Sequence, residues 1–168
     1  MLDMKQDCGI VMEDRTFRYR AAAVICRDKQ ILMATNQGVN YLYSIGGAVH
    51  LGETSVEAVT REVEEETGIR MRVSRLLFIH ENFFTELIAG RVTARHEIAL
   101  YYSMEPQQMD LMRAGGISMD SDTEQLVWVP YKDFGKINAY PDFLPDILQK
   151  DEGRVWHVLS RDDQHRFL

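Results

Sequence analysis

Cysteine is scarce in this chain, which has only Cys8 and Cys26 among its 168 residues. Two cysteines placed so far apart do not make a disulfide framework, and they lack the spacing of a zinc site. Cys26 ends the apolar run at residues 21–26, so we expect it to be a buried free thiol. The fold must therefore depend on a hydrophobic core, and residues 1–168 are long enough to form one as a single domain.

Long apolar runs are also absent. The N-terminal residues contain no apolar signal core, and no stretch approaches the ~20 residues that cross a bilayer. These features predict a cytoplasmic protein without a membrane partner.

Positive charge is in short supply. The formal net charge is −7, and the chain has no run of lysine and arginine. A broad nucleic-acid surface is therefore not expected. A small nucleotide-type partner remains compatible with this charge, because a bound metal ion can supply the missing positive charge.

Residues 54–68 carry the start and stop signals of one helix. Thr54 followed by Glu57 fits a capping box, and Gly68 stands where a helix can end in the left-handed conformation. Three valines at spacings of three and four residues are predicted to form a stripe that faces the core: Val56, Val59 and Val63.

Glutamates crowd another face of this helix, where Glu62, Glu65 and Glu66 recur at the same spacing. Like charges so placed destabilise a helix by roughly 0.2–0.5 kcal/mol per pair, so a helix that needs only solubility would alternate signs. These residues alone leave two interpretations open. One is a solvated acidic face. The other is a metal site completed by the preceding loop, where Gly46 and Gly47 permit close approach of a ligand to the backbone.

Residues 47–69 resemble the Nudix (MutT-like) box. Its pattern is glycine, five free positions, glutamate, seven free positions, arginine-glutamate, an aliphatic residue, one free position, two glutamates, one free position, glycine and an aliphatic residue. Every fixed position is filled as the family requires: Gly47, Glu53, Arg61, Glu62, Val63, Glu65, Glu66, Gly68 and Ile69. A complete match favours the metal site over the solvated face.

The resemblance implies an α/β fold, namely the Nudix-type α/β/α sandwich with a mixed β-sheet, in a single Nudix hydrolase domain. It also implies metal-dependent hydrolysis of a pyrophosphate bond in a nucleoside diphosphate linked to another moiety, such as a nucleoside triphosphate or a nucleotide sugar. The alternative is a Nudix-fold sensor that binds a nucleotide without turnover. Mg²⁺ is the implied cofactor, with Mn²⁺ as the second choice, since hard cations prefer oxygen ligands.

The same resemblance assigns roles within the box. The implied metal ligands are the Gly47 carbonyl, Glu62, Glu65 and Glu66. Glu62 or Glu65 would double as the catalytic base, and Arg61 would orient a neighbouring carboxylate. Glu53 would either brace the loop against the helix or contact the metal.

Residues outside the box are candidates for substrate binding. Arg20 could line a nucleotide pocket together with Gly46 and Gly47. Glu97 lies among apolar residues of a predicted strand, where a lone carboxylate needs a partner. Glu97 is therefore either a further ligand or base, or half of a salt bridge with a nearby arginine. His96 points the opposite way in a regular strand and is expected to be a satisfied core histidine.

The segment at residues 105–123 is long for a strand connection. We expect it to be a mobile surface loop, with a lid or a dimer contact as the alternative, so a homodimer is among the partners that the sequence allows. Glu124 follows it, in a region where the resemblance implies that an accessory glutamate can lie. Of these two interpretations, exposure to solvent is the one that we expect.

The rest of the chain alternates strand and helix signals. Strands are predicted at residues 16–20, 20–26, 31–35, 41–45, 71–84 (as one or two strands), 92–104, 126–129 and 155–159. Helices are predicted at residues 131–134 and 143–149. This order suits the sandwich that the resemblance implies.

Overall fold

The computed structural model describes residues 6–105, 124–161 and 164–168, whose strands form two sheets. The larger sheet consists of β1 (Gly9–Val11), β2 (Arg15–Val24), β6 (Gly46–Ala48), β7 (Val73–Ile88), β8 (Arg91–Met104), β11 (Trp156–Arg161) and β12 (Gln164–Phe167). The smaller sheet consists of β3 (Cys26–Arg27), β4 (Gln30–Asn36), β5 (Leu42–Ser44), β9 (Glu124–Pro130) and β10 (Ala139–Tyr140). The helices are α1 (Ser55–Thr67), the short 3₁₀ helix η2 (Tyr131–Lys136) and α2 (Leu144–Gln149).

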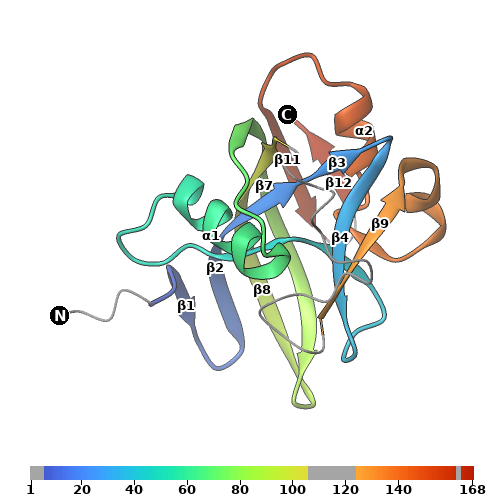
Figure 1. The fold of residues 1–168 in the computed structure, drawn as a ribbon. Helices are drawn as coiled ribbons and strands as arrows, with labels where there is room; N and C mark the ends of the chain where they lie inside the picture. The colour runs from blue at the N-terminus through green and yellow to red at the C-terminus, as the bar shows by residue number, and fades with distance from the viewer. Residues whose placement is uncertain (1–5, 106–123, 162–163) are drawn as a thin grey trace.

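Strand β8 lies at the centre of the larger sheet, whose order is β1-β2-β8-β7-β11-β12 with β6 also paired to β2. It runs parallel to β2 from Ala94 to Ser103 and antiparallel to β7. The turn between β7 and β8 contains Ala89 and Gly90, both with positive φ (48° and 79°). Two such residues give a hairpin turn the twist of its strands. The resulting long hairpin extends past the parallel pairing with β2, at the bottom of Figure 1.

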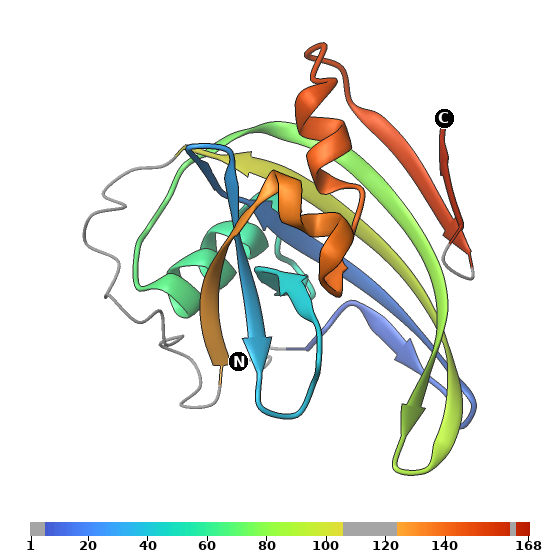
Figure 2. The same cartoon turned by 90° about the vertical axis from the view of Figure 1, so that its right-hand side faces the viewer.

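Alternation along β2 divides the core between the two faces of the larger sheet. Ala21 and Ala23 belong to a buried cluster with residues of α1. Ala22 and Val24 belong to a second buried cluster with residues of α2. Figure 2 shows α1 and α2 on different sides of the strands. The mixed sheet between helical layers confirms the predicted α/β/α sandwich.

Helix α1 begins and ends where the sequence predicts. The Thr54 hydroxyl accepts a hydrogen bond from the Glu57 N–H at 3.2 Å, and the Glu57 carboxylate accepts one from the Thr54 N–H at 2.8 Å. Gly68 follows the last turn with φ 72°, and its N–H donates to the Glu64 carbonyl at 2.9 Å. The capping box and the glycine stop are therefore both confirmed.

The buried stripe of α1 differs from the prediction. Val59 and Val63 are fully buried, but Val56 is 45% exposed, at the edge of the stripe in the first turn. The stripe is continued instead by Glu66, which is only 6% exposed. Glu66 follows Val59 by seven residues and Val63 by three, so it shares their face of the helix. Grouping Glu66 with the other two glutamates on a separate face was therefore wrong.

Most predicted strands and helices are present, with small changes of bounds. The strands predicted at residues 16–20 and 20–26 merge into β2, which ends at Val24, and residues 73–84 belong to the single strand β7. The short strands β1, β6, β10 and β12 were not predicted. The connection expected to be a loop, a lid or a dimer contact lies, after Glu105, outside the described residues.

Two further findings bear on the sequence expectations. Cys8 and Cys26 are both free, as predicted, but Cys26 is only partly buried, because it lies in the two-residue strand β3 rather than inside β2. In the described part of the chain, no helix has the length and apolar content needed to cross a membrane.

The capping box predicts the effect of one exposed substitution. Thr54→Ala removes the side-chain acceptor for the Glu57 N–H and should lower the free energy of unfolding by ~1 kcal/mol. Urea unfolding would measure the change. Thr60→Ala, on the same helix but away from its ends, is the matched control and should change stability far less. Equal effects of the two substitutions would contradict this account of the cap.

Candidate active site

The glycine loop is fixed beside α1 by its pairing with β2. Gly46 and Gly47 lie in β6, opposite Ala22 and Ala21. Gly46 has φ 135°, and a Cβ there would collide with the backbone of β2. A Cβ on Gly47 would come well within 3.0 Å of the Glu62 carboxylate. Glycine at both positions thus lets the loop lie between the sheet and the helix.

Arg61 is the charged centre of the site. Its Nε and Nη2 donate to the Glu53 carboxylate at 2.9 and 3.0 Å, and Nη2 also donates to the Ala48 carbonyl at 3.1 Å. Its Nη1 donates to Glu62 at 2.6 Å and to Glu65 at 3.1 Å. Hydrogen bonding to Glu53 is the main reason that the pKa of Arg61 is raised. One guanidinium thus joins the loop to three carboxylates.

Glu53 fastens the turn that leads into α1. Its carboxylate accepts the two bonds from Arg61 and a third from the His50 N–H at 3.0 Å. The hydrogen bond from Arg61 is the largest cause of the lowered pKa of Glu53. Glu53 therefore remains ionised and braces the loop.

The three glutamates of the box differ in exposure. The Glu65 side chain is 45% exposed and that of Glu62 is 17% exposed, whereas Glu66 is buried. Desolvation raises the pKa of Glu62, although Arg61 opposes the shift. Desolvation also raises the pKa of Glu66 to about 8. Burial thus makes Glu62 and Glu66 easier to protonate than free glutamates.

Glu66 connects the helix to the loop. Its Oε1 accepts a hydrogen bond from the Gly46 N–H at 2.9 Å. Its Oε2 is buried and has no hydrogen-bond partner among the residues that the structure describes. A buried carboxylate oxygen without a partner is costly unless a cation or a proton satisfies it.

These oxygen donors suit a hard divalent cation. Glu62 lies beside Gly47, and Glu66 offers an unpaired oxygen. Within residues 6–105, 124–161 and 164–168, however, no three His, Cys, Asp or Glu side chains already converge on one point. Glu62 and Glu65 are instead turned toward Arg61. The donor set fits a metal in chemical type, and in this structure Arg61 holds two of its carboxylates, those of Glu62 and Glu65.

Arg20 holds the other side of the loop. It is buried, and its Nη2 donates to the Ser44 carbonyl at 2.6 Å and to the Gly46 carbonyl at 2.9 Å. Its Nε is buried, and nothing in the described part of the chain accepts a hydrogen bond from it. Arg20 and Glu66 therefore grip the carbonyl and the N–H of the same glycine.

Glu97 is buried and forms an ion pair with Arg18. The Arg18 Nε donates to Glu97 at 2.7 Å. Burial opposes ionisation of Glu97, but Arg20 and Arg18 outweigh it, and the pKa of Glu97 is lowered. Of the two interpretations left open by the sequence, the salt bridge is the arrangement present here.

His80 is a buried polar residue that the sequence did not single out. Its Nε2 lies 2.7 Å from the Ser160 hydroxyl, which lies 2.6 Å from the His165 Nδ1. The His165 Nε2 lies 2.8 Å from Asp142. Desolvation lowers the pKa of His80 to about 4, so the ring is neutral near pH 7. From the sequence, His80 could be placed only in a predicted strand. Its partners Ser160 and His165 are far away in the chain and come close to it through the pairing of strands.

Two expectations about neighbouring residues were wrong. Glu124 is partly buried rather than exposed, and it accepts a hydrogen bond from the Tyr43 hydroxyl at 2.6 Å, because β9 lies in the smaller sheet with β5. His96 is not a core histidine. It is partly exposed and stacks on Phe83 with ring centroids 4.3 Å apart, because α1 does not reach this part of the sheet.

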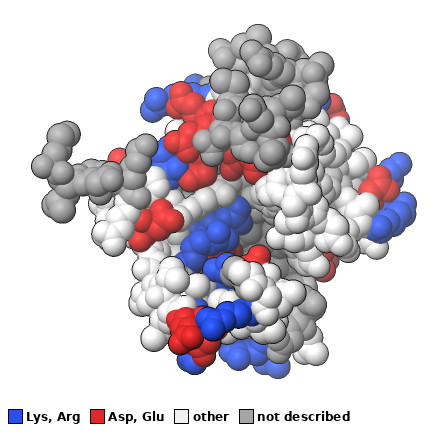
Figure 3. All heavy atoms as spheres, turned by 90° about the horizontal axis from the view of Figure 1, so that it is seen from below, with Lys and Arg blue, Asp and Glu red and all other residues white. Residues whose placement is uncertain are grey.

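Charge is mixed on the face shown in Figure 3. Lys and Arg side chains gather where the surface is hollowed, with Asp and Glu side chains around them. This face therefore has no broad basic area of the kind that a nucleic-acid duplex requires.

A model of the NUDIX domain matches residues 16–150. This chain belongs to the NUDIX family. A MutT-like protein of Streptomyces ambofaciens is 30% identical to it over 148 residues, which cover 86% of this chain and 83% of that protein. The chain is accordingly a Nudix pyrophosphohydrolase.

Solved structures agree on the fold. A mutator MutT protein from Bacillus halodurans has a TM-score of 0.58 at 16% identity, covering 89% of this chain and 97% of that one. An ADP-ribose pyrophosphatase from Streptococcus suis has a TM-score of 0.54 at 11% identity, covering 85% and 98%. At such low identities these likenesses establish the Nudix fold alone.

The raised pKa of Glu66 predicts a pH effect on stability. Its folded pKa of about 8 lies above the ordinary 4.5. The contribution of this shift to the stability of the fold is complete below pH 4.5 and is lost as the pH rises through 8. Between pH 6 and 8.5, the free energy of unfolding of the metal-free wild type should fall by roughly 3 kcal/mol more than that of Glu66→Gln, at ~1.4 kcal/mol per pKa unit. Urea unfolding in chelator at both pH values measures this difference, and parallel losses in the two proteins would refute it.

Proposed function

We propose that this Nudix pyrophosphohydrolase requires Mg²⁺, with Mn²⁺ as a substitute, and hydrolyses a small nucleoside diphosphate derivative. The contact between the glycine loop and the glutamates of α1 carries this proposal. Gly47 lies against the Glu62 carboxylate, and Gly46 donates to Glu66. This contact brings hard oxygen donors together beside backbone that a diphosphate can approach closely.

The proposed ligands of the ion are the Gly47 carbonyl, Glu62, Glu65 and Glu66. The unpaired Oε2 of Glu66 supports this assignment, since a cation there would relieve a buried, unsatisfied oxygen. When bound, the ion would neutralise phosphate charge and lower the pKa of a water molecule.

Arg61 is proposed to orient the carboxylates without being a ligand. It is held independently by Glu53 and the Ala48 carbonyl, so it keeps its position if Glu62 or Glu65 turns toward the substrate. Either glutamate can take the proton from the attacking water. Burial raises the pKa of Glu62, which brings it closer to the range that suits a base at neutral pH.

Arg20, Gly46 and Glu97 are proposed to shape the substrate side of the site. Arg20 holds the Ser44 and Gly46 carbonyls, which fixes the loop that faces the diphosphate. Glu97 holds Arg18, whose side chain is still 49% exposed. Arg18 can therefore donate to a phosphate oxygen in a charge-assisted hydrogen bond.

A small nucleotide fits this chain better than a nucleic acid does. The net charge of −7 opposes binding of a long polyanion, whereas a single diphosphate needs only the local cations and the metal. A nucleoside triphosphate and a nucleotide sugar are both candidates. The intact box carboxylates favour turnover over the nucleotide-sensor alternative.

A matched pair of variants tests the carboxylate assignment. Glu65→Gln should lower kcat by roughly 10²-fold or more, because a proposed ligand or base loses its charge. Glu64→Gln is the control, since Glu64 is exposed on the same helix and its ion pair is a long 3.8 Å contact with Arg70. It should retain nearly wild-type turnover. The assignment fails if the two variants have equal activity while both remain folded.

A substrate panel tests the reaction and the metal together. Nucleoside triphosphates, nucleotide sugars, ADP-ribose and dinucleoside polyphosphates would be incubated with Mg²⁺, and products would be identified by mass. We expect hydrolysis of one class, lost on adding chelator and restored by excess Mg²⁺ or Mn²⁺. Turnover that persists in chelator would refute metal dependence. Metal-dependent binding without any product would support the sensor instead.

A further inference from the structure

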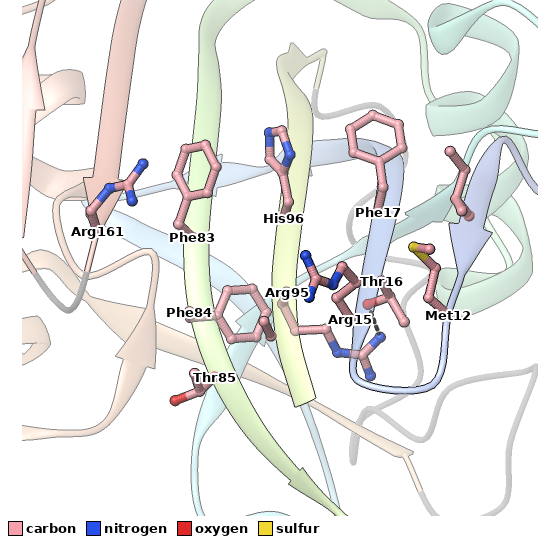
Figure 4. Close-up of a pocket in the computed structure, with 12 residues that line it drawn as sticks. Met12, Arg15, Thr16, Phe17, Phe83, Phe84, Thr85, Arg95, His96 and Arg161 are labelled. Carbon is pink, nitrogen blue, oxygen red and sulfur yellow. Dashed lines mark hydrogen bonds between the residues drawn. The ribbon is translucent and has the colours of Figure 1, made fainter. Parts of the chain in front are cut away.

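On its α1 side, the larger sheet has an area that none of the described residues covers. Tyr19 packs against the buried cluster of α1, and alternation puts Phe17 on the same face, beyond the helix. Phe17 lies opposite His96, which lies opposite Phe83, which lies opposite Arg161. Figure 4 shows these four side chains in one row across β2, β8, β7 and β11.

The rings of this row are already stacked on one another. Phe17 meets His96 edge-on at 5.2 Å, and His96 stacks on Phe83 at 4.3 Å. The Arg161 guanidinium lies over the Phe83 ring at 4.4 Å. Both faces of the Phe83 ring are therefore covered, by His96 and by Arg161. The row exposes ring edges to a partner surface and leaves no space for a planar ligand to stack on Phe83. A groove of about 460 Å³ runs along it.

Exposed aliphatic side chains extend the row in two directions. Leu87 and Val92 face each other across the hairpin and are 71% and 69% exposed. Their spacing from Phe83 and His96 is even, so they point to the same face. Ile10 and Met12, on the β1 side of the groove, are 60% and 57% exposed. We define the hairpin face by its large apolar members: Ile10, Met12, Phe17, Phe83, Leu87 and Val92.

An apolar area of this kind marks an interaction site, because soluble monomers seldom leave large apolar side chains exposed together. The described residues that line the groove include none of the proposed metal ligands, although α1 lies on the same side of the sheet. Arg18 and Glu97 alternate with Phe17 and His96 and therefore lie on the opposite face. The area is thus separate from the proposed active site.

Charges at the two ends of the hairpin face are opposite in sign. At the β11 end, Arg161 has no ion pair with any residue that the structure describes. At the β1–β2 end, the Glu13 side chain is 84% exposed, whereas Asp14 is paired with Arg15 at 2.8 Å. Among the described residues, the ion-pair partner of Glu13 is the exposed Arg91, at 3.4 Å. The face is thus apolar in the middle, with the cation of Arg161 at one end and the carboxylate of Glu13 at the other.

We propose that the hairpin face binds a second copy of this chain, with a two-fold axis that lies in the interface and runs along the strands. With such an axis, the hairpin faces of the two copies oppose each other, and the strands of one copy run across the interface in the reverse order of those of the other. The β1 end of one copy then meets the β11 end of the other. Glu13 of each copy lies where Arg161 of the other can pair with it, and the apolar middles cover each other. The surface is therefore self-complementary, as an isologous interface requires.

Sedimentation over a range of concentrations tests the apolar contact. The wild type should form a dimer of twice the 19.5 kDa chain mass. Leu87→Asp should raise the dimer dissociation constant by about 30-fold or more, as loss of a central apolar contact does. Val155→Asp is the matched control, because Val155 is 50% exposed but lies outside the hairpin face. A wild type that is monomeric at every concentration, or a dimer that Leu87→Asp leaves intact, overturns the proposal.

Charge reversal tests the direction of the axis. Arg161→Glu and Glu13→Arg should each weaken the dimer by placing like charges opposite each other. Mixing the two variants should restore association, because both contacts in the mixed dimer then join opposite charges. If mixing gives no more dimer than either variant alone, the proposed arrangement is wrong. Both substitutions are at exposed positions, and circular dichroism would show that the variants remain folded.

Discussion

The guanidinium of Arg61 offsets the repulsion between the carboxylates of the site. Three carboxylates, those of Glu53, Glu62 and Glu65, lie within hydrogen-bonding distance of it, and without a central positive charge they would repel one another. The planar group donates in several directions at once, and one of its donors reaches the loop at the Ala48 carbonyl. A lysine would supply charge but could not reproduce this fork of bonds. The box is therefore a folding element as well as a set of functional groups.

A second constraint comes from the burial of Glu66. Its position continues the apolar stripe of α1, where a valine or leucine would be more stabilising. The carboxylate is retained there with one bond from the Gly46 N–H and one unsatisfied oxygen. Local conflict between residue type and environment is typical of functional sites, since stability and function place different demands on one position. Arg20 contributes to the same compromise, because it is buried with an unpaired Nε while it holds the loop carbonyls.

Local signals made the sequence informative about α1 and about most strands. Caps, glycines and alternation act between near neighbours, so they can be read directly from the chain. The wrong predictions have two origins. The spacing of seven residues between Val59 and Glu66 does indicate that both lie on the buried face, but a charged side chain does not count toward an apolar pattern. The partial exposure of His96 depends on where α1 stops covering the sheet, and the His80 network depends on residues 80 positions apart meeting through strand pairing. The edge strands β1 and β12 are too short to show a period.

The central position of β8 has a consequence for local unfolding. From Ala94 to Ser103 this strand is paired on both sides, with β2 and with β7. From Arg91 to Thr93 it is paired with β7 alone. Opening the hairpin tip therefore breaks only the hydrogen bonds between β7 and β8. Opening the middle of β8 also breaks those between β2 and β8, and it exposes the buried clusters on both faces of the sheet. Amide hydrogen exchange in this sheet should be graded along a single strand, fast at the tip and slow near Tyr101. The exposed Leu87 and Val92 thus lie where the sheet is held by one ladder of hydrogen bonds.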